Sequence, residues 1–306
     1  MTTNSSKGIQ GIKGIKGIKD IQGIPFVLET IVQSLVPIKR NAFPWVDDQP
    51  TKEDLDHIFN QTSDEFDALK LKDEMLADLR SGKATLVTKR GPYAKVLAVV
   101  YPGTVIPWEL FGDIFIAFGQ AKRTEAKQSK ANEAKGQAKQ PNTKPWRIVW
   151  FAHPQKRLLP TKGEVAPEHV NGGYTHTCVA DTIVIYREEE VCRVLVHELL
   201  HAACTDDPSL PVADQEVYTE TWAELFLIAI LAKGSVKKAA SLWKKQAQWI
   251  ADQEYVLRNY GVTESSYGWR YTVGRRRVLA SLGIPLPPVS ANPSTNGSLR
   301  FTHAGV

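Results

Sequence analysis

The residues His197-Glu198-Leu199-Leu200-His201 are the pattern in this chain that points most directly to chemistry. Two histidines four positions apart lie one turn apart on the same helix face, so both imidazoles can bind one metal ion. Glu198 follows the first histidine and can act as general base on a water molecule bound to that metal. Apolar flanks predict that this helix is buried. We therefore expect His197 and His201 to bind Zn²⁺; a hydrogen-bonded pair of core histidines is the alternative.

A catalytic zinc ion takes three protein ligands and keeps one position open for water. Glu220 follows His201 after eighteen intervening residues, and Glu224 lies one turn further along the same predicted helix face. Two carboxylates among apolar neighbours are costly to bury without a cation. We assign Glu220 as the third zinc ligand and Glu224 as the acceptor for the second N–H of a ligand histidine. Glu216, one turn before Glu220, is the competing ligand.

These side chains need two helices and a sheet to position them. The acidic run 188–190 suits a helix N-terminus and is expected to open the motif helix, which runs to about Cys204. A second helix is predicted for 214–233, because the breakers in 205–211 allow it to fold back on the first. A further helix is predicted for 63–80, and Thr51 begins a capping box with Asp54. Apolar, β-branched runs predict three strands, at Lys95–Tyr101, Trp146–Phe151 and Thr182–Tyr186.

Composition excludes several classes of protein. In 306 residues, 42% are hydrophobic, which is enough to build a large core and argues against a disordered chain. The longest apolar run covers eight residues, too few to cross a membrane, and no secretory signal opens the chain. The net charge of +5 comes from 121–144, which holds seven Lys or Arg and two acidic residues. That stretch lacks aromatic residues on which bases would stack, so we interpret it as a linker and disfavour nucleic-acid binding through it.

Three cysteines, Cys178, Cys192 and Cys204, are too few for a disulfide framework and show no metal-binding spacing. We expect all three to be small buried residues in a protein of the reducing cytoplasm.

The motif His197–His201 with Glu220, and an acid four residues later, resembles the gluzincin class of zinc metallopeptidases. The resemblance implies two histidine ligands, a glutamate ligand from a distant helix, and the motif glutamate as general base. Glu224 stands where some members have aspartate. The resemblance also implies an edge strand that binds the substrate, for which 173–178 is in place, and an oxyanion donor. The candidates for the donor are Tyr255, Tyr260, Tyr267 and Tyr271; His176 is interpreted as a surface residue.

The segment Val170–Thr175, followed by Ile183–Arg187 and the motif helix, is similar to metallopeptidases of large DNA viruses. That likeness implies host cytoplasm or the virion as location. The fold implied is α+β and zincin-like, with a small sheet over the motif helix and a helical lower half. The chain divides into a low-complexity Gly-Ile-Lys tail (1–24), a small α+β domain of unknown role (25–120), a flexible basic linker (121–144), a zinc metallopeptidase-like domain (145–288) and a disordered tail (289–306).

The function predicted is hydrolysis of peptide bonds in a peptide or protein substrate by a zinc-bound water, with Glu198 as general base. The alternative is a non-catalytic scaffold or interaction protein in which the zinc is structural or the site is degenerate.

Overall fold

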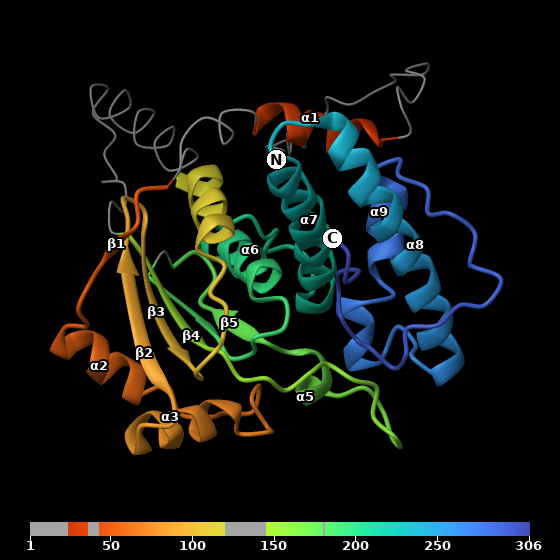
Figure 1. The fold of residues 1–306 in the computed structure, drawn as a ribbon. Helices are drawn as coiled ribbons and strands as arrows, with labels where there is room; N and C mark the ends of the chain where they lie inside the picture. Colours follow the sequence, from red (N-terminus) through yellow and green to blue (C-terminus); the bar gives the residue numbers. More distant parts are fainter. Residues whose placement is uncertain (1–23, 36–42, 120–144, 180) are drawn as a thin grey trace, which may run out of the picture.

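Six strands form one mixed sheet in the structure, a computed structural model that describes residues 24–35, 43–119, 145–179 and 181–306. The order across the sheet is β1-β2-β3-β4-β6-β5, so β5 is an outer strand (Figure 1). Together with the helices this confirms an α+β fold. The strands are β1 (Val46–Asp47), β2 (Thr85–Arg90), β3 (Ala94–Val100), β4 (Trp146–Phe151), β5 (Gly173–Thr175) and β6 (Thr182–Ile185).

The two segments predicted to be separate domains share this sheet. Strand β3, from the first segment, pairs in parallel with β4, from the second, between Ala94↔Trp146 and Val99↔Phe151. The structure therefore differs from the predicted division at 120–145, because the apolar runs of both segments complete one core. The predicted linker 121–144 and the tail 1–24, apart from the buried Ile24, lie outside the described residues.

Helices cover both faces of the sheet. Side chains alternate along β3, so Leu97 and Val99 face α2 (Lys52–Phe59) and α3 (Leu71–Ser81), whereas Val96 and Ala98 face the core on the motif-helix side. On that second face lie a helix over 108–119 and α6 (Val191–Ala202), and α7 (Val212–Ala232) packs against α6 (Figure 1). The remaining helices surround α7 or lie near the sheet: α1 (Phe26–Ser34), α5 (Pro167–Val170), α8 (Val236–Tyr260), η3 (Tyr267–Tyr271) and α9 (Arg275–Ser281).

The capping box at Thr51 is present, with Thr51 and Asp54 accepting from each other's backbone N–H. The helix predicted for 63–80 is shorter, and α3 begins only at Leu71. The cause is Asp67, whose carboxylate accepts the backbone N–H groups of Leu71 and Lys72 and so fixes the first turn there. The residues before Leu71, from Ser63 to Lys70, form a loop instead of helix.

The motif helix also begins later than predicted. Glu190 precedes it with a positive φ of 60°, and α6 starts at Val191, so the run 188–190 does not form an acidic first turn. The Glu190 carboxylate instead accepts the backbone N–H groups of Phe301 and Thr302. The segment 289–306 is accordingly not the disordered tail that was predicted, since Leu299 and Phe301 are buried in the core.

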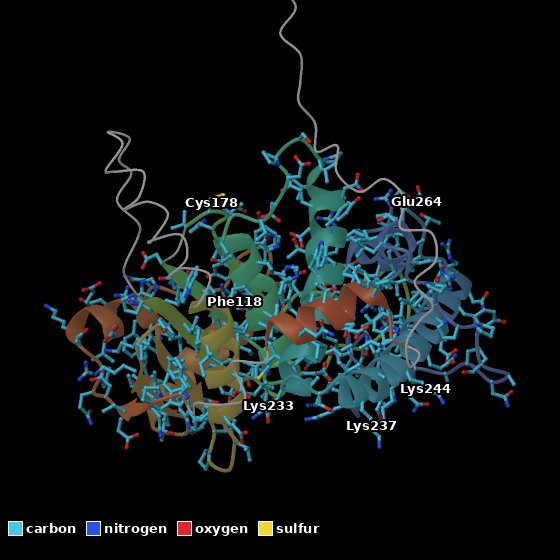
Figure 2. All side chains as sticks on the ribbon, turned by 90° about the horizontal axis from the view of Figure 1, so that it is seen from above. Phe118, Cys178, Lys233, Lys237, Lys244 and Glu264 are labelled. Atoms are coloured by element: carbon cyan, nitrogen blue, oxygen red, sulfur yellow. A yellow bond between two sulfur atoms is a disulfide. The ribbon has the colours of Figure 1, made fainter. Side chains whose placement is uncertain are left out.

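A disulfide joins Cys178 to Cys204, and only Cys192 is a buried free thiol. Both bonded cysteines are exposed, and Cys178 lies at the periphery of the molecule (Figure 2). The prediction that all three are buried and unpaired is therefore wrong, because chain folding brings together two residues that are 26 positions apart. The cysteine argument for a reducing compartment no longer holds. No helix in the described parts of the chain is long and apolar enough to span a membrane.

Replacing Cys178 and Cys204 together by serine should lower the free energy of unfolding by about 3 kcal/mol, the loop-closure entropy expected for a ring of this size. Chemical denaturation of oxidised and reduced wild-type protein and of the double variant measures it. Cys192→Ala is the control and should leave the difference between oxidised and reduced protein intact. An equal stability of oxidised and reduced wild type would contradict the structural role of the bond.

Candidate metal centre

Three possible metal-ligand atoms converge where α6 packs against α7. The Nε2 atoms of His197 and His201 lie 3.0 Å apart, and Glu216 Oε2 lies 3.4 Å from the first and 3.8 Å from the second. Both histidines are buried, and the Glu216 side chain is 20% exposed. Among the described residues, His197, His201 and Glu216 form the group of side chains whose ligand atoms lie close enough together to hold a metal ion.

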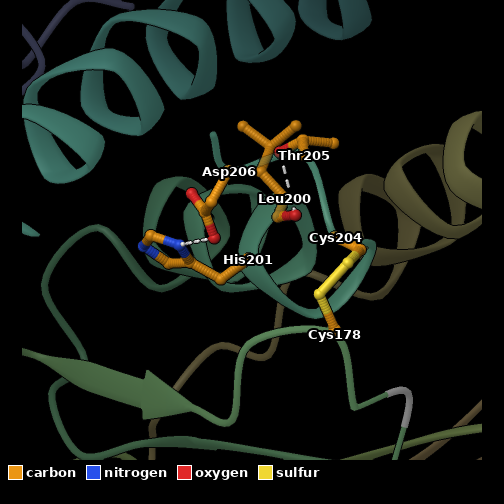
Figure 3. The surroundings of a disulfide bond; sticks show 6 residues. All are labelled: Cys178, Leu200, His201, Cys204, Thr205 and Asp206. Atoms are coloured by element: carbon orange, nitrogen blue, oxygen red, sulfur yellow. Dashed lines mark hydrogen bonds and ion pairs between the residues drawn. A yellow bond between two sulfur atoms is a disulfide. The ribbon is translucent and has the colours of Figure 1, made fainter. Parts of the chain in front are cut away.

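The second nitrogen of each ring faces a carboxylate. His201 Nδ1 lies 2.8 Å from Asp206 Oδ2 (Figure 3), and His197 Nδ1 lies 3.1 Å from Glu220 Oε1. A carboxylate at Nδ1 keeps the proton there in a neutral imidazole, which leaves a lone pair on Nε2. Without a metal the two Nε2 atoms lie within hydrogen-bond distance of each other, as in the alternative of a hydrogen-bonded histidine pair. When both rings are neutral and protonated at Nδ1, their two lone pairs and the Glu216 carboxylate oxygen point to one place, an arrangement that a cation would stabilise.

These separations fit one tetrahedral ion. Ligands at 2.0–2.1 Å from a tetrahedral zinc are about 3.4 Å from one another. The three observed separations, 3.0, 3.4 and 3.8 Å, scatter around that value. Imidazole and carboxylate ligands also suit Zn²⁺ better than Ca²⁺ or Mg²⁺, which take oxygen ligands. The residues present therefore fit the metal that the sequence predicts.

The roles of the three helical glutamates differ from the sequence-based assignment by one turn. Glu216, the competing ligand, faces both Nε2 atoms, whereas Glu220 contacts His197 Nδ1 and forms an ion pair with Arg193. Glu224 contacts neither histidine and lies 2.9 Å from Arg275. The two acids, four positions apart, that face the histidines are thus Glu216 and Glu220, whereas the sequence predicts Glu220 and Glu224. The physical reason is that Arg193 and Arg275 take the two later carboxylates, a pairing that helix periodicity does not reveal.

Glu198 lies beside the metal-ligand group and is 5% exposed. Strand β5 approaches it so closely that a Cβ on Gly173 would lie 2.7 Å from Val194 Cγ1 and 3.4 Å from Glu198 Oε1. A side chain larger than glycine would therefore push the strand away from the helix. Burial raises the pKa of Glu198 to about 7, which suits a group that must take up a proton near neutral pH.

The site opens into a cleft with a volume of about 390 Å³. Its walls come from segments far apart in the sequence: the loop at Asp64 and Phe66, β5 with His176 and Thr177 after it, α6, α7, and the single residues Arg157, Tyr271 and Phe301. His176 is exposed at the rim. Of the four tyrosines predicted as oxyanion donors, Tyr271 is the one that lines the cleft. Tyr255 is 47% exposed, Tyr260 donates to Pro160 O, and Tyr267 donates to Asn171 Oδ1.

Sequence reasoning missed Asp206 and the cleft arginines. Asp206 lies five residues after His201, in the turn that ends α6, and its carboxylate contacts His201 Nδ1. An acidic residue so soon after the second motif histidine could have indicated this contact. The disulfide holds the same turn: the backbone N–H groups of Cys178 and Cys204 both donate to His201 O. The outer end of the motif helix and the strand-end loop at Cys178 are thereby tied together (Figure 3).

No protein-family model, no curated protein and no solved structure matches this chain. Its function therefore has to be inferred from the geometry of the site alone.

Glu216→Gln should reduce zinc affinity far more than Glu220→Gln. The first change removes a proposed ligand, whereas the second removes the charge beside His197 Nδ1 and the ion-pair partner of Arg193. The loss for Glu220→Gln is expected to be roughly 10–100-fold. Glu224→Gln is the matched control on the same helix and should leave zinc affinity unchanged. Competition titrations with a zinc chelator measure all three; zinc binding that depends on Glu220 but not Glu216 would restore the sequence-based assignment.

Zinc affinity should rise with pH by about 100-fold per unit between pH 6 and 7, because both imidazoles must lose a proton to bind metal. Burial alone would lower the pKa of His197. The charge of Glu220, together with hydrogen bonds to Glu216 and Glu220, outweighs burial and raises that pKa to about 9. Burial alone would likewise lower the pKa of His201, but hydrogen bonds from its ring to the Asp206 and Glu216 carboxylates outweigh burial and raise that pKa to about 11. An affinity independent of pH would mean that the metal-free imidazoles are already neutral.

Proposed function

We propose that this protein is a zinc-dependent metallopeptidase that hydrolyses peptide bonds in a peptide or protein substrate. The observation that carries the proposal is the convergence of His197, His201 and Glu216 beside the buried Glu198 in an open cleft. Three ligands rather than four would leave a position of the metal available to water and substrate, as catalytic zinc sites require. A structural site would instead be closed by a fourth protein ligand.

Each residue has a distinct task in this proposal. His197, His201 and Glu216 would hold the ion, and Asp206 and Glu220 keep the two rings oriented through their Nδ1 atoms. Zinc, when bound, supplies Lewis-acid polarisation of the substrate carbonyl and lowers the pKa of water. Glu198 takes the proton from the attacking water and passes it to the leaving amine.

The cleft also offers the means to position a peptide. Strand β5 is an outer strand, so an extended substrate can pair with its free edge and lie along the cleft. Tyr271 is the proposed hydrogen-bond donor to the oxyanion. The Tyr267 hydroxyl donates its proton to Asn171, so the Tyr271 hydroxyl, 3.3 Å away, donates to Tyr267. In this proposal Tyr271 redirects that proton to the substrate oxygen when the oxyanion forms.

Glu198→Gln should keep zinc at one equivalent and lower peptide turnover by at least about 100-fold, because a neutral amide cannot accept the proton. Elemental analysis of purified protein and cleavage of a mixed peptide library measure the two quantities. Glu198 and Gln have nearly the same shape, so folding should be unchanged.

A protein that neither carries nor binds zinc would refute the proposal. A zinc-loaded wild type that is inert on every peptide would favour a non-catalytic scaffold in which the metal is structural.

A further inference from the structure

Two buried arginines line the cleft that contains the candidate metal centre. Arg157 comes from the loop after β4 and is 0% exposed; Arg193 comes from α6, one turn before His197, and is 2% exposed. Arginine stays charged even when buried, so each guanidinium needs acceptors for its five N–H groups. The contacts of these two side chains leave that need partly unmet.

Arg157 uses most of its donors on the surrounding backbone. Its Nε donates to Val170 O at 2.8 Å, and its Nη1 donates to Glu189 O at 3.0 Å with the Glu190 carboxylate 3.5 Å away. Its Nη2 has no acceptor among the described residues. This nitrogen packs against Gly172, and a Cβ at position 172 would lie only 1.9 Å from it. The Arg157 side chain can therefore adopt this position only because residue 172 is glycine.

Arg193 is less well satisfied. Its Nη2 donates to the Glu220 carboxylate and to Glu220 O, whereas Nε and Nη1 have no acceptor among the described residues. Both guanidinium groups also lie over the ring of Phe301, at 5.0 Å for Arg157 and 4.9 Å for Arg193. The aromatic ring holds the two cations close to each other at one end of the cleft.

Arg187 shows that unpaired donors are not a general property of the buried arginines here. It is equally buried, at 1% exposed, and does not line the cleft. Its guanidinium donates to the backbone oxygens of Asn171, Gln155, Lys156 and Glu168. Among the buried arginines of the described residues, unpaired donors are therefore confined to the two that line the cleft.

The nearby carboxylates form ion pairs with the two arginines but also accept from other groups, and they leave three guanidinium nitrogens without an acceptor. Glu220 lies between Arg193 and His197, and Glu190 accepts the backbone N–H groups of Phe301 and Thr302. Glu189 accepts the backbone N–H of Arg157. Three buried guanidinium nitrogens without acceptors carry a substantial free-energy cost unless a ligand supplies them.

We propose that Arg157 and Arg193 form a subsite for a carboxylate of the substrate, so that the enzyme prefers peptides with an acidic group close to the cleaved bond. This inference rests on the proposed function. A carboxylate offers two planar acceptor oxygens, which match the fork of a guanidinium. Arg193 lies about 6 Å from His197 along the helix, and an extended peptide rises about 3.3 Å per residue, so the acidic group falls within one or two residues of that bond.

The test measures peptide binding to the zinc-loaded Glu198→Gln protein, which binds without turnover. Peptides carrying Glu should bind roughly 10–100-fold more tightly than the same peptides carrying Gln. A second pair, with a free or an amidated C-terminus, distinguishes a side-chain carboxylate from a terminal one. Glutarate should displace a bound acidic peptide, and the neutral glutaramide should not.

Arg157→Gln should abolish most of the preference for the acidic peptide, while Arg187→Gln, a change of the same kind at a matched buried site, should preserve it. If Arg157→Gln does not fold, the glutarate and paired-peptide measurements on the unmodified cleft still decide the question.

Equal binding of all acidic and neutral pairs, or a full preference retained by Arg157→Gln, would overturn the subsite. Wild-type protein that cleaves acidic and neutral peptides equally well would overturn this inference and leave the peptidase proposal standing. A protein that binds no zinc but still prefers the acidic peptides would overturn the peptidase proposal and leave the carboxylate-binding subsite standing.

Discussion

The packing of α6 against α7 creates the constraint on which the rest of the site depends: two imidazole nitrogens and a carboxylate oxygen lie within 3.8 Å of one another in a largely buried position. Three electron-rich atoms so close together repel one another in the absence of protons or a cation. The surrounding elements act to maintain this arrangement. Asp206 and Glu220 fix the rings, and β5 closes one side of the helix, which requires glycine at 173.

Much of the fold could be predicted because it depends on local patterns. Apolar β-branched runs identified β3, β4 and β6, and the capping residues identified α2. The shared sheet could not be predicted, because the pairing of β3 with β4 joins residues about fifty positions apart and leaves no local signal. The packing of 299–301 was missed for the same reason. Leu299 and Phe301 are isolated apolar residues in a mostly polar tail, and their burial depends on distant partners such as Glu190, which accepts the backbone N–H of Phe301.

The candidate site divides in the same way. The spacing of His197, Glu198 and His201 follows from one turn of helix and was readable in the sequence. The choice between Glu216 and Glu220 depends on how far α7 is shifted along α6 and on which carboxylate Arg193 attracts. Helix periodicity shows on which face of α7 a residue lies, but not which residue of α6 it lies opposite. A one-turn error is therefore the expected limit of such reasoning.

The covalent tie between Cys178 and Cys204 has a thermodynamic consequence for the centre beside it. The backbone N–H groups of both cysteines donate to the carbonyl oxygen of His201, whose ring belongs to the candidate metal-ligand group. Thermodynamic linkage is reciprocal. If reduction of the disulfide changes the free energy of metal binding, metal binding must change the free energy of disulfide reduction by the same amount. An ion held at this group would then be linked to the state of the disulfide to the extent that opening the bridge moves His201. In that case the thiol–disulfide balance of the surroundings would become a variable of metal binding.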